Sequence, residues 1–553
     1  MKKDLVNILQ DCIQKYWDMP VFTDFHGETM QYKDLARKIA KLHLLYESAG
    51  IKPGDKIALC GKNSSRWAVA FLATMTYGAV IVPLLHEFKA ENLHHLVNHS
   101  DARLFFVDES IWEHLDPEQM KNLEGVIGLK DFKPILSRNE KFNDAATHLN
   151  ELFGNRYPSR FTKADVKYFE VTDPNSLAVI NYTSGSTGFS KGVMIPHRAL
   201  WSNADYMIHH LDIPSKGSSM VCMLPMAHMY GLVTEMIHAT VKGAHLYFLT
   251  RQPSPKVLLE AFRTTRPELI ITVPLIIEKI IKTKVFPTLD KPLTRLLLRT
   301  PLVDRKILAK VKEALMTTFG GNLKMMIVGG AGLNREVEEF LLRIKFPITV
   351  GYGMTECAPL IGYAHAKDFR SASCGQLVPR MQIKVLSPDP ENIPGEIMVK
   401  GDNVMLGYYK NPEATQAVMR PDGWMLTGDV GTIDKDGFIY IRGRNKTMIL
   451  GPSGQNIYPE EIEQKLNNMP MVAESLVIDS GEGKLTALIY PDQEIIDKEA
   501  LSPEQVHDRL AKVIAEVNPQ LEAYSRIANF KVMKEEFEKT PKRSLKRYLY
   551  VNN

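Results

Sequence analysis

Short apolar runs typical of buried strands alternate with helical patterns over roughly the first 360 residues of this chain. Each run is followed by turn glycines or by the start of a helix. Because parallel neighbouring strands need a long crossover connection, usually a helix, this alternation predicts α/β layers with largely parallel, buried strands. Clear examples are residues 177–181 (LAVIN), 269–271 (LII), 325–330 (MMIVGG) and 347–353 (PITVGYG).

The pattern changes in the last third of the chain. Short strands of period two, separated by Pro, Asp and Gly corners, predict a small β-rich subdomain at about 375–444. Residues 445–553 then combine a helix that begins with acidic residues and a pair of strands that predict a hairpin. We therefore expect a large N-terminal domain over 1–444 and a small α+β C-terminal domain over 445–553.

Composition excludes several classes of protein. The 553 residues include 68 Lys and Arg against 64 Asp and Glu, and a net charge of +4 on such a chain does not indicate a nucleic-acid binder. The five cysteines are scattered without a C-x-x-C pair, so we expect neither a disulfide framework nor a zinc site. This cysteine usage favours a reducing, cytoplasmic location.

One segment has nearly the length of a membrane span. Trp67–Leu85 contains no charged residue, and a bilayer crossing needs about 20 apolar residues. The same segment also fits a buried helix through Ala73, a break near Tyr77 and Gly78, and a β-branched strand at 80–82. We favour this second interpretation, with at most peripheral membrane contact.

A Gly-, Ser- and Thr-rich segment, 182–193, directly follows the strand predicted at 177–181. Its glycines let the backbone approach an anion, its hydroxyl and N–H groups can donate to phosphate oxygens, and Lys191 adds a cation. It is not a Walker A loop, because Ser190 stands where the second glycine should be and Gly192 follows the lysine. A flexible connector is the alternative, but this ordered combination favours phosphate binding. The predicted phosphate-binding residues are Thr183, Ser184, Gly185, Ser186, Thr187, Gly188 and Lys191.

This segment resembles the signature of the adenylate-forming (AMP-binding) superfamily, which includes acyl-CoA synthetases, nonribosomal peptide synthetase adenylation domains and luciferases. Other motifs in the same order extend the resemblance over nearly the whole chain, and within the acyl-CoA synthetase branch the chain resembles long-chain fatty acid–CoA ligases. These motifs are 224–228 (LPMAH), 329–333 (GGAGL), 351–356 (GYGMTE), 423–429 (GWMLTGD), 442–446 (RGRNK) and 456–463 (NIYPEEIE).

The resemblance implies an ATP-dependent acid–thiol ligase. A carboxylate is joined to the α-phosphate of ATP with release of pyrophosphate, and the acyl group passes to coenzyme A. Glu356 would ligate Mg²⁺ together with Thr187, Tyr352 would stack on adenine, and Asp429 would accept from the ribose hydroxyls. The implied catalytic residues are Lys191, Thr355, Glu356, His228 and Lys546, and the further nucleotide contacts are Gly330, Ala331, Tyr352, Gly353, Thr355, Asp429 and Arg444.

Two sequence features indicate which class of carboxylic acid the enzyme would accept. The resemblance implies that His228 is a gate to the acyl pocket. Amino-acid-activating relatives have an Asp at this position, so the histidine disfavours an amino-acid substrate. Acetate-activating relatives have a Trp where this chain has Gly353. With Gly329 and Gly330, this glycine predicts an open channel, in which each buried CH₂ contributes about 0.8 kcal/mol and medium or long chains are favoured. The alternative for Gly353 is a tight turn.

Near the C-terminus the chain departs from the pattern. Ser544 occupies the place of the family's catalytic lysine, with Lys542 and Lys546 two residues away, and we take Lys546 as the substitute cation.

The resemblance also implies that the C-terminal domain is mobile, with a hinge at Lys446. Two alternatives stay open: an enzyme that loads an acyl carrier protein, and an adenylation-impaired nucleotide- or acyl-binding protein. The sequence leaves the oligomeric state undetermined.

Overall fold

Two compact units make up the fold of this computed structural model, and each is described by itself. The structure describes residues 4–183, 190–251, 254–301, 303–450, 455–481, 484–540 and 545–551. The first unit comprises Met1–Thr183, Lys191–Gln382 and Lys400–Gly423, and the second comprises Ser184–Ser190, Ile383–Val399 and Trp424–Asn553.

The first unit contains an eight-stranded sheet in the order β20-β9-β8-β4-β3-β5-β6-β7. Its five central strands are parallel and almost entirely buried, whereas β9, β20 and β7 run antiparallel to their neighbours. This is the geometry expected when helical crossovers connect the buried strands. The strands are β3 (Lys56–Cys60), β4 (Val80–Leu84), β5 (Ala102–Val107), β6 (Gly125–Gly128), β7 (Pro134–Ser137), β8 (Leu177–Thr183), β9 (Lys191–Pro196) and β20 (Gly407–Tyr408).

A second sheet of seven strands has the order β14-β13-β12-β10-β11-β1-β2, and all its pairings are parallel except that of β1 with β2. The strands predicted in the first 360 residues are β8, β12, β13 and β14, so the predicted α/β layers are confirmed. The strands are β1 (Pro20–Asp24), β2 (Thr29–Gln31), β10 (Ser219–Cys222), β11 (His245–Phe248), β12 (Leu269–Thr272), β13 (Met325–Val328) and β14 (Ile348–Val350).

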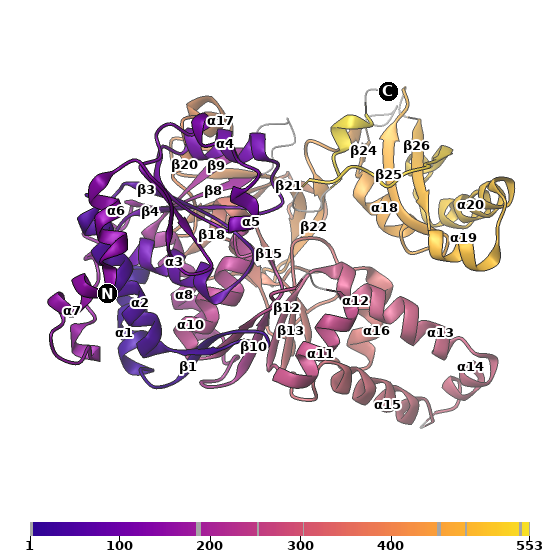
Figure 1. The fold of residues 1–553 in the computed structure, drawn as a ribbon. Coiled ribbons are helices and arrows are strands. Elements are labelled where there is room, and N and C mark those ends of the chain that lie inside the picture. Colours follow the sequence, from indigo (N-terminus) through magenta and orange to yellow (C-terminus); the bar gives the residue numbers. More distant parts are fainter. Residues whose placement is uncertain are drawn as a thin grey trace. The chain divides into compact units, whose positions relative to one another are not determined.

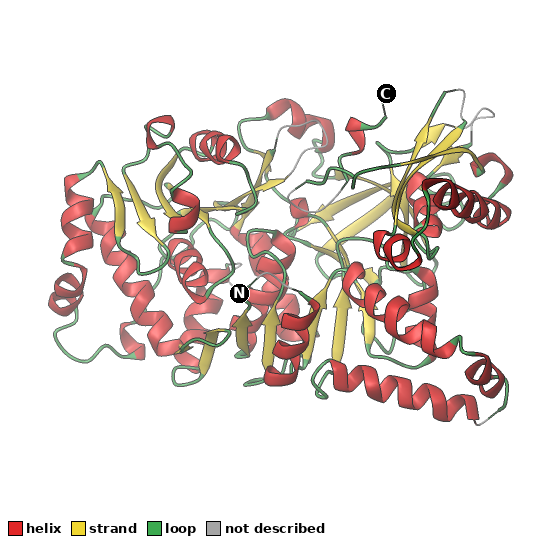
Figure 2. Ribbon diagram, turned by 45° about the vertical axis from the view of Figure 1, so that its right-hand side comes forward, coloured by secondary structure: helices red, strands yellow, loops and turns green. Residues whose placement is uncertain are grey.

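Helices α3, α8 and α10 lie between these two sheets (Figures 1 and 2). The helix α3 begins after Ser64, whose side chain accepts from the Trp67 N–H, and every residue of α3 except Arg66 is buried. The segment Trp67–Leu85 is therefore a core helix, a turn and the strand β4, as predicted. Among the described residues, no helix combines the length and the apolar character that a membrane crossing requires.

Other helices cover the far face of the seven-stranded sheet. Phe262 of α11 and Leu341 of α16 pack in one core cluster with Ile270, Met326 and Ile348 of the sheet. The α- and π-helices of the first unit are α1 (Leu5–Lys15), α2 (Tyr32–Ser48), α3 (Ser65–Thr76), α4 (Ala90–His99), α5 (Glu109–Trp112), α6 (Glu140–Thr147), α7 (Leu149–Arg156), α8 (His197–His210), α9 (Met229–Gly231), a π-helix (Leu232–Ile237), α10 (His238–Lys242), α11 (Pro255–Thr265), α12 (Pro274–Ile280), a second π-helix (Ile281–Val285), α13 (Phe286–Leu289), α14 (Pro292–Leu298), α15 (Val303–Thr318), α16 (Arg335–Arg343) and α17 (Pro412–Val418).

A small sheet of β15 (Tyr352–Gly353), β16 (Leu360–Tyr363) and β17 (Gln376–Leu377) completes the first unit. The second unit contains the sheet β18-β19-β21-β22, the pair β23-β24 and the sheet β25-β26-β27. Strands β25 and β26 form the predicted antiparallel hairpin, on which α18 and α20 pack. The elements are β18 (Met381–Leu386), β19 (Gly395–Gly401), β21 (Met425–Ile433), β22 (Ile439–Arg444), β23 (Ile449–Leu450), β24 (Asn456–Ile457), α18 (Pro459–Leu466), β25 (Val472–Asp479), β26 (Leu485–Pro491), α19 (Gln493–Glu499), α20 (Pro503–Val517) and β27 (Ile527–Val532).

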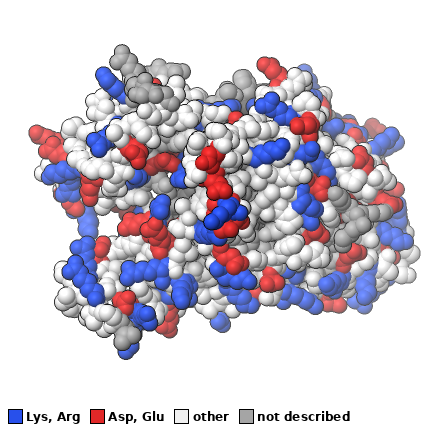
Figure 3. All heavy atoms as spheres, turned by 180° about the vertical axis from the view of Figure 1, so that it is seen from behind, with Lys and Arg blue, Asp and Glu red and all other residues white. Residues whose placement is uncertain are grey.

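Charged side chains of both signs are interspersed on the face drawn in Figure 3. Basic and acidic groups alternate there without one sign dominating, as the near balance of 68 basic and 64 acidic residues leads one to expect. Among the described residues, that face offers no large field of one sign to attract a polyanion.

Candidate active site

The two ends of the predicted phosphate-binding segment are held side by side by an antiparallel strand pair. Thr183 at the end of β8 is in register with Lys191 at the start of β9, and its hydroxyl donates to the Lys191 carbonyl at 3.4 Å. Ser184, Gly185, Ser186, Thr187 and Gly188 lie outside the described residues, so their phosphate contacts stay predictions. The hairpin fixes where the intervening segment leaves and re-enters the sheet.

Tyr408 connects two residues predicted for the site. Its strand β20 pairs with β9, and this pairing brings the Tyr408 ring to 4.8 Å from the Lys191 ammonium. Its hydroxyl donates to Glu356 Oε1 at 2.9 Å. Burial, together with the nearby Glu356 carboxylate, raises the pKa of Tyr408 well above its usual value, so the hydroxyl keeps its proton and remains a donor. Sequence analysis missed Tyr408, because its place depends on the register of β20 against β9.

Glu356 sits in a short 3₁₀ turn, Thr355–Cys357, that follows β15. The Met405 N–H donates to the Glu356 carbonyl at 2.8 Å, so the backbone of this residue is fixed as well as its carboxylate. Thr355 is buried in the same turn. The structure thus brings together Lys191, Thr355 and Glu356 with Tyr408, within one unit.

The donor set around Glu356 can be compared with the needs of Mg²⁺. No cluster of three or more His, Cys, Asp or Glu side chains suited to a metal occurs among the described residues. A single carboxylate fits Mg²⁺ that arrives with a nucleotide, because Mg²⁺ in such sites takes one or two carboxylates and completes its shell with phosphate oxygens and waters. Glu356 therefore has the chemistry expected of a ligand to the ion of MgATP.

The glycines predicted to open an acyl channel have other partners. A Cβ on Gly353 would lie 2.3 Å from the Pro359 carbonyl oxygen, so the tight β15–β16 turn itself requires glycine, which is the alternative noted above. A Cβ on Gly329 would lie 2.8 Å from the Tyr230 ring, which fills that space. The expectation of open space beside Gly329 is therefore wrong. At Gly330, with φ of +86°, a Cβ would meet only Val273, at 3.8 Å.

His228 ends the loop that follows β10 and begins the helix α9. Its Nδ1 accepts from the Tyr230 N–H at 3.2 Å, which in a neutral imidazole places the proton on Nε2. The Tyr230 hydroxyl lies 3.2 Å from the Thr272 carbonyl and 3.4 Å from that of Ile327, at the ends of two parallel strands. No local sequence pattern indicates that Tyr230 covers Gly329.

Asp429 and Arg444 face each other in the second unit. They are in register on β21 and β22, and Arg444 Nε donates to Asp429 Oδ1 at 3.1 Å. Asp429 is buried, whereas the Arg444 side chain is 70% exposed. The arrangement holds the Asp429 carboxylate in one orientation on a rigid strand, as a ribose-binding acid requires.

Of the residues predicted to act in the C-terminal region, the structure describes Lys546 and Lys446. Lys546 forms an ion pair with Glu538 at 2.9 Å, and the Glu538 side chain is 64% exposed. Ser544 and Lys542 lie outside the described residues. Lys446, the predicted hinge, is exposed between β22 and β23.

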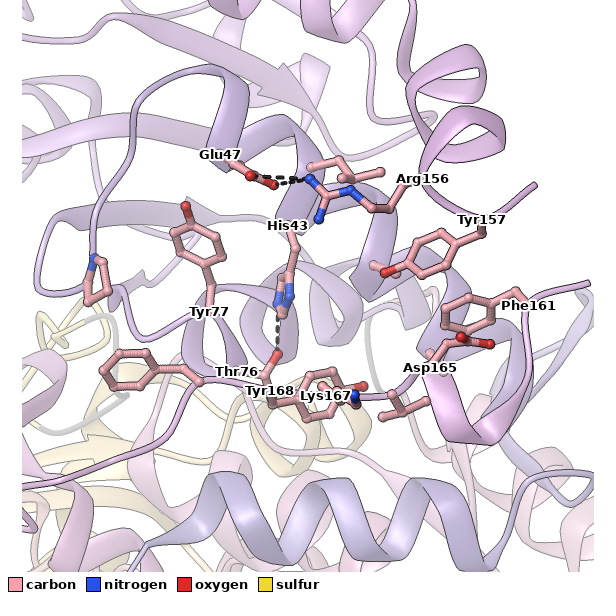
Figure 4. A pocket seen from close by; sticks show the side chains of 16 residues that line it. His43, Glu47, Thr76, Tyr77, Arg156, Tyr157, Phe161, Asp165, Lys167 and Tyr168 are labelled. Carbon is pink, nitrogen blue, oxygen red and sulfur yellow. Dashed lines mark hydrogen bonds and ion pairs between the residues drawn. The ribbon is translucent and has the colours of Figure 1, made fainter. Parts of the chain in front are cut away.

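A separate cavity of about 370 Å³ lies between α2, α3 and residues 156–169 (Figure 4). Figure 4 shows His43 bonded to Thr76 on one side, and Glu47 paired with Arg156 on another. None of the residues predicted for catalysis lines it. This cavity is distinct from the candidate active site.

Replacing Tyr408 by Phe tests the connection between Lys191 and Glu356. We expect the rate of acid-dependent pyrophosphate exchange to fall about tenfold, because a hydrogen bond to a charged group contributes about 1.5–3 kcal/mol and only part of it is specific to the transition state. The control is Tyr409→Phe, which removes the same hydroxyl from the next residue, where it donates to Asp101 at 2.7 Å. Equal rates in the two variants would contradict the role given to Tyr408.

Comparison with known proteins places the chain in a family. Residues 9–409 match the family described as AMP-binding enzyme, and residues 446–553 match the AMP-binding enzyme C-terminal domain. A long-chain-fatty-acid–CoA ligase of Escherichia coli O6:H1 is 27% identical over 530 residues, covering 90% of this chain and 87% of that one.

Solved structures share the fold. ATP-bound MatB from Rhodopseudomonas palustris matches with a TM-score of 0.77 at 21% identity, covering 99% of this chain and 98% of that one. A benzoate CoA ligase from Burkholderia xenovorans matches with a TM-score of 0.75 at 17% identity, covering 99% of both chains. These likenesses confirm the predicted α/β fold class.

The chain belongs to the AMP-binding enzyme family, whose members form adenylates. Within that family it is an AMP-forming acyl-CoA synthetase, an enzyme that uses ATP and coenzyme A.

Proposed function

We propose that this acyl-CoA synthetase acts on a medium- or long-chain fatty acid. The observation that carries the proposal is the likeness, over 90% of the chain, to a relative named as a long-chain-fatty-acid–CoA ligase. His228, in place of the acidic residue of amino-acid-activating relatives, supports a substrate without an ammonium group. The benzoate ligase among the structural neighbours makes aryl acids the natural comparison.

In the proposed reaction, an oxygen of the acid forms a bond to the α-phosphorus of MgATP while the bond to pyrophosphate breaks. Glu356 would hold the ion that neutralises the phosphates, and Lys191 and Thr355 would donate to phosphate oxygens. The thiol of coenzyme A then attacks the acyl carbon, the acyl–oxygen bond breaks and AMP leaves. Asp429 would keep the ribose in place, since two carboxylate oxygens suit a vicinal diol.

The test is coenzyme A-dependent formation of AMP and acyl-CoA from acetate, octanoate, palmitate and benzoate. We expect kcat/KM to rise from acetate to octanoate or palmitate, because each CH₂ that is buried adds about 0.8 kcal/mol. A preference for benzoate or acetate would overturn the fatty-acid proposal and leave the enzyme class intact. Replacing coenzyme A by a holo acyl carrier protein tests the alternative acceptor.

Enlarging the space beside Gly329 tests whether Tyr230 limits the acyl pocket. In Tyr230→Ala, we expect the ratio of kcat/KM for a longer acid to that for a shorter one to rise about fourfold for each CH₂ that the new space holds, from about 0.8 kcal/mol per CH₂. Tyr230→Phe, which keeps the ring, is the control and should leave the ratio unchanged. An unchanged ratio in Tyr230→Ala would place the acyl chain elsewhere.

Ser544 motivates the second candidate, an adenylation-impaired binding protein. We propose instead that Lys546 serves as the cation, because its pair with the largely exposed Glu538 is of a kind that contributes only about 0–1 kcal/mol and is easily given up. Lys546→Ala should then lower pyrophosphate exchange about 10²-fold, the scale of losing one electrostatic stabiliser. Lys539→Ala, which removes a lysine paired with Glu474, is the control.

Two results would contradict this role for Lys546. An unchanged rate of pyrophosphate exchange in Lys546→Ala would remove the residue from the mechanism. A large gain in Ser544→Lys would indicate that the natural chain is a weak adenylator, which is the second candidate.

We also propose the domain boundary at 444/445, with a hinge at Lys446 and a cytoplasmic location. The end of one family match at residue 409 and the start of the next at 446 support this boundary. Proteolysis between β22 and β23, with and without MgATP, tests whether the segment around Lys446 changes its exposure during the reaction.

A further inference from the structure

A buried carboxylate holds the loop that leads to His228. Glu235 lies in the π-helix Leu232–Ile237 and has no exposed surface. Its Oε1 accepts from the Met223 N–H at 3.1 Å, and its Oε2 accepts from the Leu224 N–H at 3.1 Å and from the Cys222 thiol at 3.2 Å. One side chain thus binds three consecutive residues where β10 ends.

Asn63, which lies between β3 and α3, holds the same loop from the other sheet. Its amide nitrogen donates to the Leu224 carbonyl at 2.6 Å, and its amide oxygen accepts from the Met226 N–H at 2.9 Å. Further along, the Asn181 side chain on β8 donates to the Ala227 carbonyl at 2.8 Å. The loop 223–227 is therefore bound to both large sheets, immediately before His228.

Burying the Glu235 carboxyl group costs folding free energy, and packing alone does not explain why a carboxyl group is found there. Burial raises the pKa of the Glu235 carboxyl to about 8, although the hydrogen bonds from Met223, Cys222 and Leu224 oppose this rise. An apolar residue would fill the same volume without the cost of burying a carboxyl group. Single-turn π-helices also occur frequently at functional sites. What the carboxylate adds is the fixed position of two backbone N–H groups and a thiol.

We infer that Glu235, together with Asn63, is a positioning residue that fixes loop 223–227 and thereby places His228 for the reaction of the acid. This inference rests on the proposed function, because it takes His228 to lie at the acyl pocket. A positioning role for Glu235 differs from a purely structural role in what a substitution changes. A structural residue would affect the fraction of folded enzyme, whereas a positioning residue affects turnover of the enzyme that has folded.

Glu235→Gln, compared with the natural enzyme above pH 8, where Glu235 is the carboxylate, is the direct variant, because glutamine has the same shape but presents an NH₂ group to at least one of the three donors. The control is Glu268→Gln. Glu268 is also buried and accepts from a backbone N–H, that of Ser215 at 3.0 Å, and it pairs with Lys324 at 2.7 Å. Ser215 precedes β10, whereas loop 223–227 follows it. The two glutamates therefore bind the segments that precede and follow β10. Asn63→Ala is the second variant if Glu235→Gln does not fold.

Hydrogen exchange of the full-length chain, followed in peptides that cover 222–228, is the first measurement. We expect exchange there to be about tenfold faster in Glu235→Gln or Asn63→Ala, and unchanged in Glu268→Gln. Acid-dependent pyrophosphate exchange is the second. We expect kcat per folded enzyme to fall roughly 10- to 100-fold in Glu235→Gln, with the KM for MgATP within about twofold of the natural enzyme, because small misplacement of a reacting group has effects of this size.

Unchanged protection of 222–228 in both variants would overturn the inference, and so would faster exchange there without loss of kcat. Equal loss of kcat in Glu235→Gln and Glu268→Gln would reduce Glu235 to a structural residue. If the natural enzyme shows no pyrophosphate exchange with any acid, the proposed function fails. Hydrogen exchange would then still show whether Glu235 holds the loop.

Discussion

Replacing Glu356 by Gln should lower the rate of acid-dependent pyrophosphate exchange by about 10²- to 10³-fold, the cost of removing one preorganised electrostatic group. The substitution keeps the shape of the side chain and an oxygen facing Tyr408, but it removes the charge that a magnesium ion needs from its one protein carboxylate. The 3₁₀ turn and the Met405 contact to the Glu356 backbone do not depend on that charge, so the fold should be retained.

A magnesium titration distinguishes this explanation from a general loss of activity. In Glu356→Gln, the Mg²⁺ concentration for half-maximal exchange should rise, and the KM for the acid should change little. Tyr408→Phe, which leaves the carboxylate in place, serves as the comparison and should lose only about tenfold. If Glu356→Gln loses no more than Tyr408→Phe, Glu356 is not the ligand of the metal.

Replacing Asp429 by Asn is expected to raise the KM for MgATP and the Kd for AMP about 10- to 100-fold. Hydrogen bonds to a charged acceptor contribute about 1.5–3 kcal/mol each, and the change also leaves Arg444 without the carboxylate that it now contacts at 3.1 Å. Calorimetric titration with AMP measures the affinity directly, without any need for turnover.

The control for Asp429→Asn is Glu396→Gln, which changes a carboxylate in the same sheet that accepts from Asn445 at 3.1 Å. That variant should bind AMP as the natural chain does. Equal affinity of Asp429→Asn and the natural chain would remove Asp429 from the nucleotide site and leave the ribose contact to another residue.

Local pattern was enough to predict much of the fold. Strands β8, β12 and β13 were visible as apolar runs, and the hairpin of β25 and β26 followed from period-two alternation. These features depend on neighbours in the sequence, so periodicity reveals them. The segment Trp67–Leu85 also resolved into a helix and a strand, because its break at Tyr77 and Gly78 is local.

Contacts between distant segments could not be predicted in this way. Tyr408 reaches Glu356 only because β20 pairs with β9, and the ring of Tyr230 covers Gly329 only because α9 lies against β13. The sequence analysis did not single out Glu235, since its three partners precede it across a loop whose path the sequence does not specify. In each case, the contact depends on how segments distant in the sequence pair or pack, which local pattern does not show.

The close approach of Gly353 to Pro359 has a practical consequence for protein engineering. In this enzyme a bulky side chain cannot be grafted at 353 to shorten the acids it accepts, because the first carbon of any side chain would collide with a main-chain oxygen 2.3 Å away. Redesign of chain-length preference would have to begin from residues whose side chains can be trimmed or extended, and variants with a side chain at position 353 should be less stable than the natural chain.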